Sequence, residues 1–355
     1  MTDNDNDNSL PAVLAIDGGN SKTDLALIAS DGAVLASLRG PGVSHEDFGL
    51  EEAMRRLAEL VEAVAGRIGR SPGDGLIARH TSACLAGADL PEEEAMLTAA
   101  IQRQGWTTTT AVANDTFAVL RAGLAPAAGE RPWGIAVTCG AGINCVGVAP
   151  DGRTTRFLAF GMISGDWGGG AGLGQQAVWH AIRAEDGRGE PTELRTAVPG
   201  FYRLPSMHDV VVAFHLGKLG EDDLLKLPAV LFATAAAGDA VALRLIERQA
   251  EEIATMAATA IGRLGLADAG LADAGPDSNA AAAIPVILGG GVLEAKNPLL
   301  TAAITRHLAE RAPAAVISVV DAPPVTGAAL LGLDHLNAAP AAEARLRASY
   351  PLNRT

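Results

Sequence analysis

The sequence predicts an α/β protein made of two similar domains, each with strands and helices in the order βββαβα. The chain has 355 residues, more than one hydrophobic core usually organises, and 48% of them are hydrophobic. A pattern in the first half, "AVLAIDGGNSKTDLALIASDGAVLASL", returns in the second as "IAVTCGAGINCVGVAPDGRTTRFLAF". Both have an apolar run, a Gly-rich turn, an apolar run, an Asp-Gly turn and a third run. A repeat of this length indicates an internal duplication.

The first half supplies one complete set of these elements. Apolar runs predict strands, spacing at three and four residues predicts helices, and Pro with acids marks a helix start. We expect strands over 12–17, 23–29, 33–40, 81–88 and 107–115, and helices over 46–69, 90–105 and 116–123.

The second half repeats the set around a long helical block. Asn297 and Pro298 suit the N-cap and first position of a helix. We expect strands over 133–138, 143–148, 154–160, 284–292 and 315–320, helices within 172–264 with loops near 186–191 and 199–206, and helices over 297–312 and 323–337. The Ala/Gly/Asp-rich segment 266–283 predicts a surface insertion.

These elements give a domain division. We expect a disordered N-terminus over 1–10, a first domain over 11–126, a second domain with the helical insertion over 127–337, and a tail over 338–355. The predicted hinge lies near 125–133 and again near the final helix.

Composition limits the partners. The formal net charge is −14, which disfavours nucleic acid because an acidic surface repels phosphate backbones. The three cysteines, Cys84, Cys139 and Cys145, fit neither a zinc motif nor a disulfide framework. The start has no signal-peptide pattern, and no apolar run is long enough to span a membrane. We therefore expect a cytoplasmic protein without a membrane partner.

The stretch "AIDGGNSKTD" (15–24) carries the first indication of chemistry. It can be a plain surface turn, but glycines also let backbone amides approach a phosphate. Asp17 could hold Mg²⁺ against the phosphates, and Ser21, Lys22 and Thr23 add donors. Because a similar turn recurs in the second half, we favour a phosphate clamp that grips one polyphosphate from two sides.

Four motifs in order, "DGGNSKT", "AND", "GAGINC" and "GDWGGGAGLG", resemble the BadF/BadG/BcrA/BcrD ATPase family. The resemblance covers 12–337 and is greatest to the N-acetylglucosamine kinase members. It implies two ribonuclease H-like (actin-like ATPase) domains flanking a nucleotide cleft, with ATP and Mg²⁺ as cofactors and a small-molecule sugar as acceptor. An amino sugar such as N-acetylglucosamine is the expected substrate, and a homodimer the expected assembly.

The resemblance also implies roles for single residues. Asp17 would hold the metal. The first phosphate turn would be formed by Gly18, Gly19, Asn20, Ser21 and Lys22, the second by Gly140, Ala141, Gly142 and Asn144, and the adenosine would lie against Gly289, Gly290 and Gly291.

Asp115 would be the catalytic base that takes the proton of the sugar hydroxyl. Its alternative role is the N-cap of helix 116–123, and both roles can hold together. The resemblance implies a sugar site formed by Ser44, Asn114, Asp115, Phe160, Gly161 and Asp166.

Three departures concern mainly the identity of the sugar. Ala141 supplies no hydroxyl where the family often has Thr, Ser44 replaces a common Asn, and Trp167 replaces a common acid. Trp167 could stack on a sugar or fill the hinge. Two other functions remain open: an ATPase activator of a 2-hydroxyacyl-CoA dehydratase, which needs thiolates for an iron–sulfur cluster, and a non-catalytic sugar or nucleotide sensor.

Overall fold

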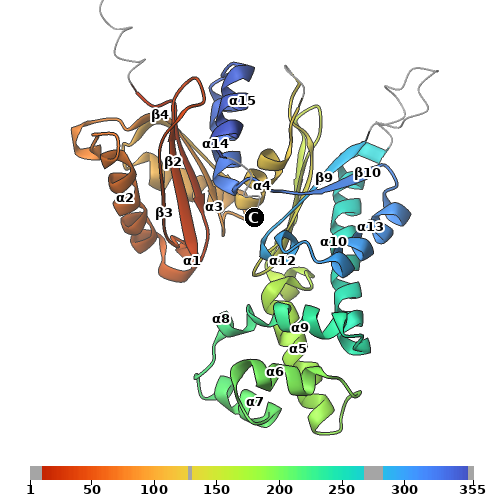
Figure 1. Cartoon of the computed structure of the whole chain (residues 1–355). Coiled ribbons are helices and arrows are strands. Elements are labelled where there is room, and N and C mark those ends of the chain that lie inside the picture. Colours follow the sequence, from red (N-terminus) through yellow and green to blue (C-terminus); the bar gives the residue numbers. More distant parts are fainter. Residues whose placement is uncertain (1–9, 127–129, 268–282, 351–355) are drawn as a thin grey trace, which may run out of the picture. The chain divides into compact units, whose positions relative to one another are not determined.

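The computed structural model describes residues 10–126, 130–267 and 283–350, and the chain forms two compact units (Figure 1). The first unit combines Met1–Trp133 with Val320–Thr355, and the second is Gly134–Val319. The predicted disorder of 1–10, most of the insertion 266–283 and part of the predicted hinge fall outside the described residues.

The first unit contains a five-stranded sheet in the order β3-β2-β1-β4-β5. Its antiparallel strands are β1 (Val13–Gly18), β2 (Lys22–Ile28) and β3 (Val34–Pro41), and β4 (Ala78–Leu85) and β5 (Thr107–Asn114) continue it in parallel. The predicted strand order along the chain is confirmed, with ends shifted by up to three residues.

Alternation along β1 and β2 gives this sheet two buried faces. Leu14 and Ile16 face a core that includes Leu57 of α2 (Leu50–Gly66). Val13 and Ala15 face a second core with residues of α14 (Pro324–His335). The sheet is therefore covered on both sides, which explains the nearly continuous apolar runs.

The predicted helix over 46–69 is interrupted. It forms a short α1 (His45–Phe48) and then α2, because Gly49 between them adopts a φ of 77° that ends the first turn. The other helices after strands are α3 (Pro91–Gln102) and α4 (Asp115–Gly123).

The second unit repeats the strand arrangement, with the sheet order β10-β9-β6-β7-β8. Its strands are β6 (Gly134–Cys139), β7 (Ile143–Val148), β8 (Thr154–Arg156), β9 (Ile284–Gly289) and β10 (Ala315–Val319), with β6 antiparallel to β7 and parallel to β9. The duplication thus holds in the fold. The predicted strand 154–160 was too long: a short 3₁₀ helix over Gly161–Ser164 follows an irregular segment.

Helices fill the region between β8 and β9. They are α5 (Gly169–Glu185), α6 (Leu194–Tyr202), α7 (Met207–His215), α8 (Glu221–Leu224), α9 (Leu227–Ala236) and α10 (Ala240–Leu264). The predicted loop over 199–206 was partly wrong, since Pro199 lies inside α6. After β9 follow α12 (Gly291–Glu294) and α13 (Pro298–Arg311), and Asn297 caps α13 as predicted.

The closing helix belongs to the first unit. The chain leaves the second unit after β10 and contributes α14 and α15 (Pro340–Ser349) to the first, where they accompany the red and orange strands in Figure 1. This differs from the predicted boundary of 127–337 and from the undefined tail over 338–355. The reason is apolar: Val325 and Ala329 of α14 pack against the Val13 face of β1.

No single helix among the described residues is long and apolar enough to cross a membrane. The bent pair Glu221–Ala236 and Ala240–Leu264, with 118° between its halves, passes that test by length and composition only.

Candidate active site

The turn between β1 and β2 is held by backbone contacts. Gly19 N donates to Lys22 O at 2.9 Å, and Val43 N donates to Gly19 O at 3.3 Å. A Cβ on Gly42 would overlap the carbonyl of Asn20, so only glycine lets the following segment lie this close. The side chains of Asn20, Ser21 and Lys22 remain exposed. The predicted first turn is thus closed by backbone hydrogen bonds and leaves the polar side chains at 20–22 accessible.

The two predicted carboxylates lie at one edge of the sheet. β1, β4 and β5 are parallel, and their register places Gly18, Leu85 and Asn114 side by side. Asp17 and Asp115 therefore lie at the same edge of the sheet, at the carboxyl ends of β1 and β5, with β4 between these two strands.

The N-cap interpretation of Asp115 was wrong by one residue. Asn114 is the cap of α4, because its Oδ1 accepts from Thr116 N at 2.9 Å. Asn114 Nδ2 in turn donates to Asp89 Oδ1 at 2.7 Å. Asp115 is the first helical residue and lies in the positive end of the helix dipole.

The charges at this edge are coupled. Burial, and then the negative charges of Asp115 and Asp24, raise the pKa of Asp17 to about 7, against opposing effects of Lys22 and Arg39. Burial likewise raises the pKa of Asp115. Two carboxylates whose joint ionisation is unfavourable can serve, one as a proton acceptor and the other as a ligand of a cation.

Sequence reasoning missed an ion pair beside Asp17. In the cross-strand register Asp17 faces Asp24, and Asp24 faces Arg39. Arg39 binds Asp24 through two hydrogen bonds of 2.7 and 2.8 Å, although Asp24 is only 7% exposed. Asp24 stands out as a carboxylate in an apolar strand, but nothing in the sequence pairs it with Arg39.

The second turn lies between β6 and β7, and two glycine strings pack against it. Gly170 N donates to Gly140 O at 2.7 Å, and Ala171 N donates to Ala141 O at 3.0 Å. Gly290 has a φ of 88°, and a Cβ there would lie 2.6 Å from Cys139 C. The structure therefore brings the predicted groups 140–142 and 289–291 together. Of the glycines 168–170, Gly168 is the N-cap of α5, and Gly169 and Gly170 are its first two residues.

The start of α5 depends on a residue that the sequence did not indicate. Gln249 of α10 is fully buried, and its Oε1 accepts from Gly169 N at 2.9 Å. A Cβ on Gly168, which has a φ of 108°, would overlap the same amide. Only tertiary packing between α5 and α10 reveals this role.

The predicted sugar-binding residues divide between the units. Phe160, Gly161 and Asp166 form one loop in the second unit: Asp166 N donates to Gly161 O at 3.0 Å, and Ser164 Oγ donates to Asp166 Oδ2 at 2.5 Å. Trp167 is 7% exposed and lies under Arg248 at 4.3 Å, which favours a packing role over stacking on a sugar.

Ser44, Asn114 and Asp115 belong to the first unit. Ser44 precedes α1 and is 4% exposed, and among the described residues its Oγ has no hydrogen-bond partner. A buried hydroxyl without a partner is costly, so this donor is available to a ligand.

All three cysteines are buried and none presents a thiolate. Burial raises the pKa of Cys84 and Cys145, and that of Cys139 to about 12. Among the described residues no group of three His, Cys, Asp or Glu side chains could hold a metal by itself.

Comparison with known proteins identifies the family. The model of the BadF/BadG/BcrA/BcrD ATPase family matches residues 14–332. The chain belongs to the BadF/BadG/BcrA/BcrD ATPase family. The resemblance inferred from the four motifs is thereby confirmed.

Two curated relatives of this family member are kinases. The N-acetylmuramic acid/N-acetylglucosamine kinase of Clostridium acetobutylicum is 30% identical over 244 residues, which is 68% of this chain and 76% of the relative. The N-acetyl-D-glucosamine kinase of Dictyostelium discoideum is 23% identical over 327 residues, which is 90% of this chain and 97% of the relative.

Solved structures confirm the fold. A candidate N-acetylglucosamine kinase of Chromobacterium violaceum has a TM-score of 0.67 at 22% identity, covering 92% of this chain and 99% of that one. A second such protein, from Porphyromonas gingivalis, has a TM-score of 0.64 at 20% identity and the same coverage. The BadF/BadG/BcrA/BcrD chain therefore has the predicted pair of actin-like ATPase domains.

Proposed function

We propose that this ATP-dependent carbohydrate kinase transfers the γ-phosphoryl group of ATP to a hydroxyl of an N-acetylated amino sugar, with N-acetylglucosamine as the acceptor. Its relatives of 30% and 23% identity carry that specificity in their names. The single structural observation that supports the chemistry is the pair of Asp17 and Asp115 at one sheet edge, each with a raised pKa.

Asp115 is the proposed general base. As the sugar oxygen forms its bond to the γ-phosphorus, the bond between the γ-phosphorus and the β,γ-bridging oxygen breaks, and the hydroxyl proton passes to Asp115. A carboxylate with a raised pKa accepts that proton more readily than an exposed one. The hydrogen bond from Asn114 to Asp89 fixes the end of β5 from which α4 starts.

Asp17 is the proposed ligand of Mg²⁺. Magnesium is usually held by one or two carboxylates together with substrate phosphates, which matches a site with few protein ligands. The mutual repulsion of Asp17 and Asp115 fits this group, because a cation would offset it. When bound, the ion would neutralise charge on the transferred phosphoryl group.

The remaining residues are proposed to bind the substrates. Backbone amides of 18–22 and 140–142 would contact phosphates, with Asn144 beside the second turn, and 289–291 would adjoin adenosine. The free hydroxyl of Ser44 supports a sugar contact. The other proposed acceptor contacts are Asn114, Phe160, Gly161 and Asp166.

The alternative as a dehydratase activator is disfavoured by the cysteines. A cluster shared between subunits needs thiolates at a surface, and Cys84, Cys139 and Cys145 are buried with raised thiol pKa values.

A coupled assay of ADP release tests the proposal. We expect ADP with N-acetylglucosamine, and much less with glucose or glucosamine, because those lack the acetamido group. N-acetylmuramic acid belongs in the panel because one relative's name includes it. ADP released without sugar would support the activator, and none under any condition would support a sensor. The homodimer stays a prediction for sedimentation measurements.

A further inference from the structure

Helix α4, which begins with Asp115, packs closely against α14, near the C-terminus of the chain. A Cβ on Gly327 of α14 would overlap the carbonyl of Ala118, so α14 and α4 meet backbone to backbone. The contact lies within the first unit, and Ala118 is fully buried.

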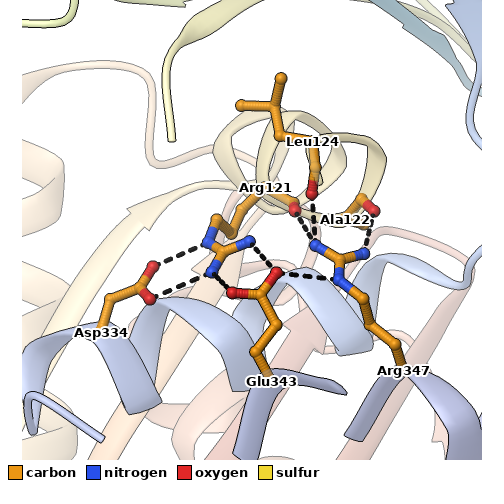
Figure 2. A network of polar contacts seen from close by, with 6 residues as sticks. All are labelled: Arg121, Ala122, Leu124, Asp334, Glu343 and Arg347. Atoms are coloured by element: carbon orange, nitrogen blue, oxygen red, sulfur yellow. Dashed lines mark hydrogen bonds and ion pairs between the residues drawn. The ribbon is translucent and has the colours of Figure 1, made fainter. Parts of the chain in front are cut away.

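A buried arginine on α4 faces two carboxylates. Arg121 is 3% exposed, and its guanidinium donates to Asp334 of α14 at 2.7 and 3.1 Å and to Glu343 of α15 at 2.9 and 2.6 Å (Figure 2). Such two-point pairs fix orientation as well as distance. The side chain of Arg121 therefore ties α4 to both closing helices.

A second arginine, Arg347 of α15, binds the C-terminal end of α4. Arg347 of α15 donates to the carbonyls of Ala122 at 2.8 Å, Arg121 at 3.2 Å and Leu124 (Figure 2). Its Nε also donates to Glu343 Oε1 at 2.9 Å. The last carbonyls of a helix lack intrahelical partners, so Arg347 caps α4.

We propose that Arg347, supported by Glu343, is a positioning residue for catalysis: it fixes the C-terminal end of α4 and thereby the aspartate at the other end. The inference rests on the proposed role of Asp115. Helix α4 has 9 residues and is about 13 Å long, too short to absorb a shift at one end by bending.

The consequence for rate follows from geometry. A misplacement of about 1 Å at a reacting group can cost roughly a hundredfold in rate. The hydrogen-bond partners of Arg347 include none of the residues proposed to bind nucleotide, so its loss should lower kcat and leave the KM for ATP unchanged. The KM for the sugar should rise with the loss of kcat, because Asn114 and Asp115 at the start of α4 belong to the proposed sugar site. A purely structural residue would instead lower the fraction of folded enzyme.

The chain offers a matched control two residues away. Arg345 lies on the same helix, is 56% exposed in its side chain, and pairs with Asp31 at the turn between β2 and β3. Arg345→Gln and Arg347→Gln therefore change the same charge on the same helix, but only the second removes contacts to α4.

In the full-length enzyme we expect Arg347→Gln to lower kcat by about tenfold or more, with the KM for ATP within about twofold of the wild type. Arg345→Gln should retain the kcat of the wild type. Arg347→Lys should recover only part of kcat, because one ammonium cannot span the three carbonyls and Glu343. Thermal melts of each variant measure the folded fraction.

Equal kcat in both glutamine variants overturns the proposal, and so does a loss of kcat that matches the loss of folded enzyme. If Arg347→Gln destabilises the protein, Glu343→Gln serves as the second variant: it keeps the shape of the side chain but weakens the contacts that Glu343 makes with Arg347 and with Arg121 of α4. Asp115→Ala distinguishes the two proposals. Full activity of Asp115→Ala would contradict the role of Asp115 as the base. If Asp115→Ala is inactive but Arg347→Gln has the kcat of the wild type, only the positioning role of Arg347 is contradicted.

Discussion

The carboxylate of Asp17 destabilises the ligand-free folded protein, although the proposed reaction uses it. Its pKa is raised to about 7, mainly by burial and by Asp115. A raised pKa in the folded state means that the group favours folding while protonated. That contribution is complete at pH values below its unfolded pKa near 4, and it is lost as the pH rises through 7.

Asp17→Asn should therefore stabilise the ligand-free protein at pH 8 while impairing the enzyme. The amide removes the repulsion between Asp17 and Asp115, and we expect the Tm to rise by on the order of a few degrees. Melting curves at pH 5 and pH 8 check this, since the gain should shrink at pH 5. A variant less stable than wild type at pH 8 contradicts the assignment.

The same group predicts a pH-dependent affinity for magnesium nucleotide. Protonation of Asp17 competes with the cation below pH 7, so binding of Mg·ADP should weaken by about tenfold from pH 8 to pH 6. Calorimetric titration measures it. Asp17→Asn is the control, because it retains the titration of the nucleotide but loses that of Asp17.

Asp115→Ala should fold, bind Mg·ATP and lose kcat by on the order of a hundredfold or more, as removal of a general base does. Rapid-quench measurement of sugar phosphate formation separates the chemical step from product release. Turnover like that of the wild type would exclude Asp115 from the mechanism.

For single residues, the sequence predicted a functional role only where the residue type is unusual for its position in a strand or turn. Asp17, Gly19 and Asp115 could be predicted because each interrupts or follows an apolar run. Arg39 and Gln249 could not, because a strand arginine and a helix glutamine are ordinary until their partners in space are known.

Among the elements, α4, α14 and α15 form a group that no local pattern connects. The strands were predictable because their two-residue alternation and buried runs are local properties. The helix α15 was missed because its Ala-rich segment carries a weak apolar stripe; Leu346 and Ala342 become buried only through contact with the first unit. The end of β8 was misjudged for a related reason, since the apolar Leu158 and Phe160 are exposed.

The contact between the string 289–291 and the second turn can be tested with two neighbouring glycines. Gly290→Ala forces a Cβ into the backbone of Cys139 at a φ of 88°, whereas nothing lies within 4 Å of a Cβ on Gly291. We expect Gly290→Ala to lower the Tm and to weaken Mg·ADP binding by about tenfold or more, since strained backbone displaces the turn.

Gly291→Ala is the matched control for folding. It should keep the wild-type Tm, and any loss of nucleotide affinity in it would report direct contact with adenosine. Unchanged stability in both variants would show that the turn does not depend on close backbone approach.

In the whole molecule, the two repeats have the same order of strands, but they differ in which part of the chain supplies their last helices. Both sheets have the same arrangement, and the strands of both repeats could be predicted from the sequence. The last helices break the symmetry, because α14 and α15 complete the first unit instead of the second. The predicted domain division suggested the opposite. The apolar face of α14 that packs on β1, and the close approach of Gly327 to Ala118, explain the observed placement.

A fragment that ends where the chain first passes from the first unit to the second, after Trp133, should therefore fail to fold by itself. Residues 1–133 include the whole first sheet, but they leave the face of Val13 and Ala15 without α14 and leave Arg121 without Asp334 and Glu343. An unpaired buried guanidinium and an open apolar face are each destabilising. We expect broad, non-cooperative melting and strong binding of a hydrophobic dye.

Joining the missing segment should restore the unit. A chain of residues 1–133 linked to 320–355 through a flexible connection regains the cover of the sheet and both carboxylates, and it should melt cooperatively. The same fusion with Gly327→Leu is the control, because it has the full sequence length but cannot place α14 on α4. Cooperative folding of 1–133 alone would mean that the sheet and α4 are self-sufficient, and the closing helices would then serve the catalytic helix without being needed to form it.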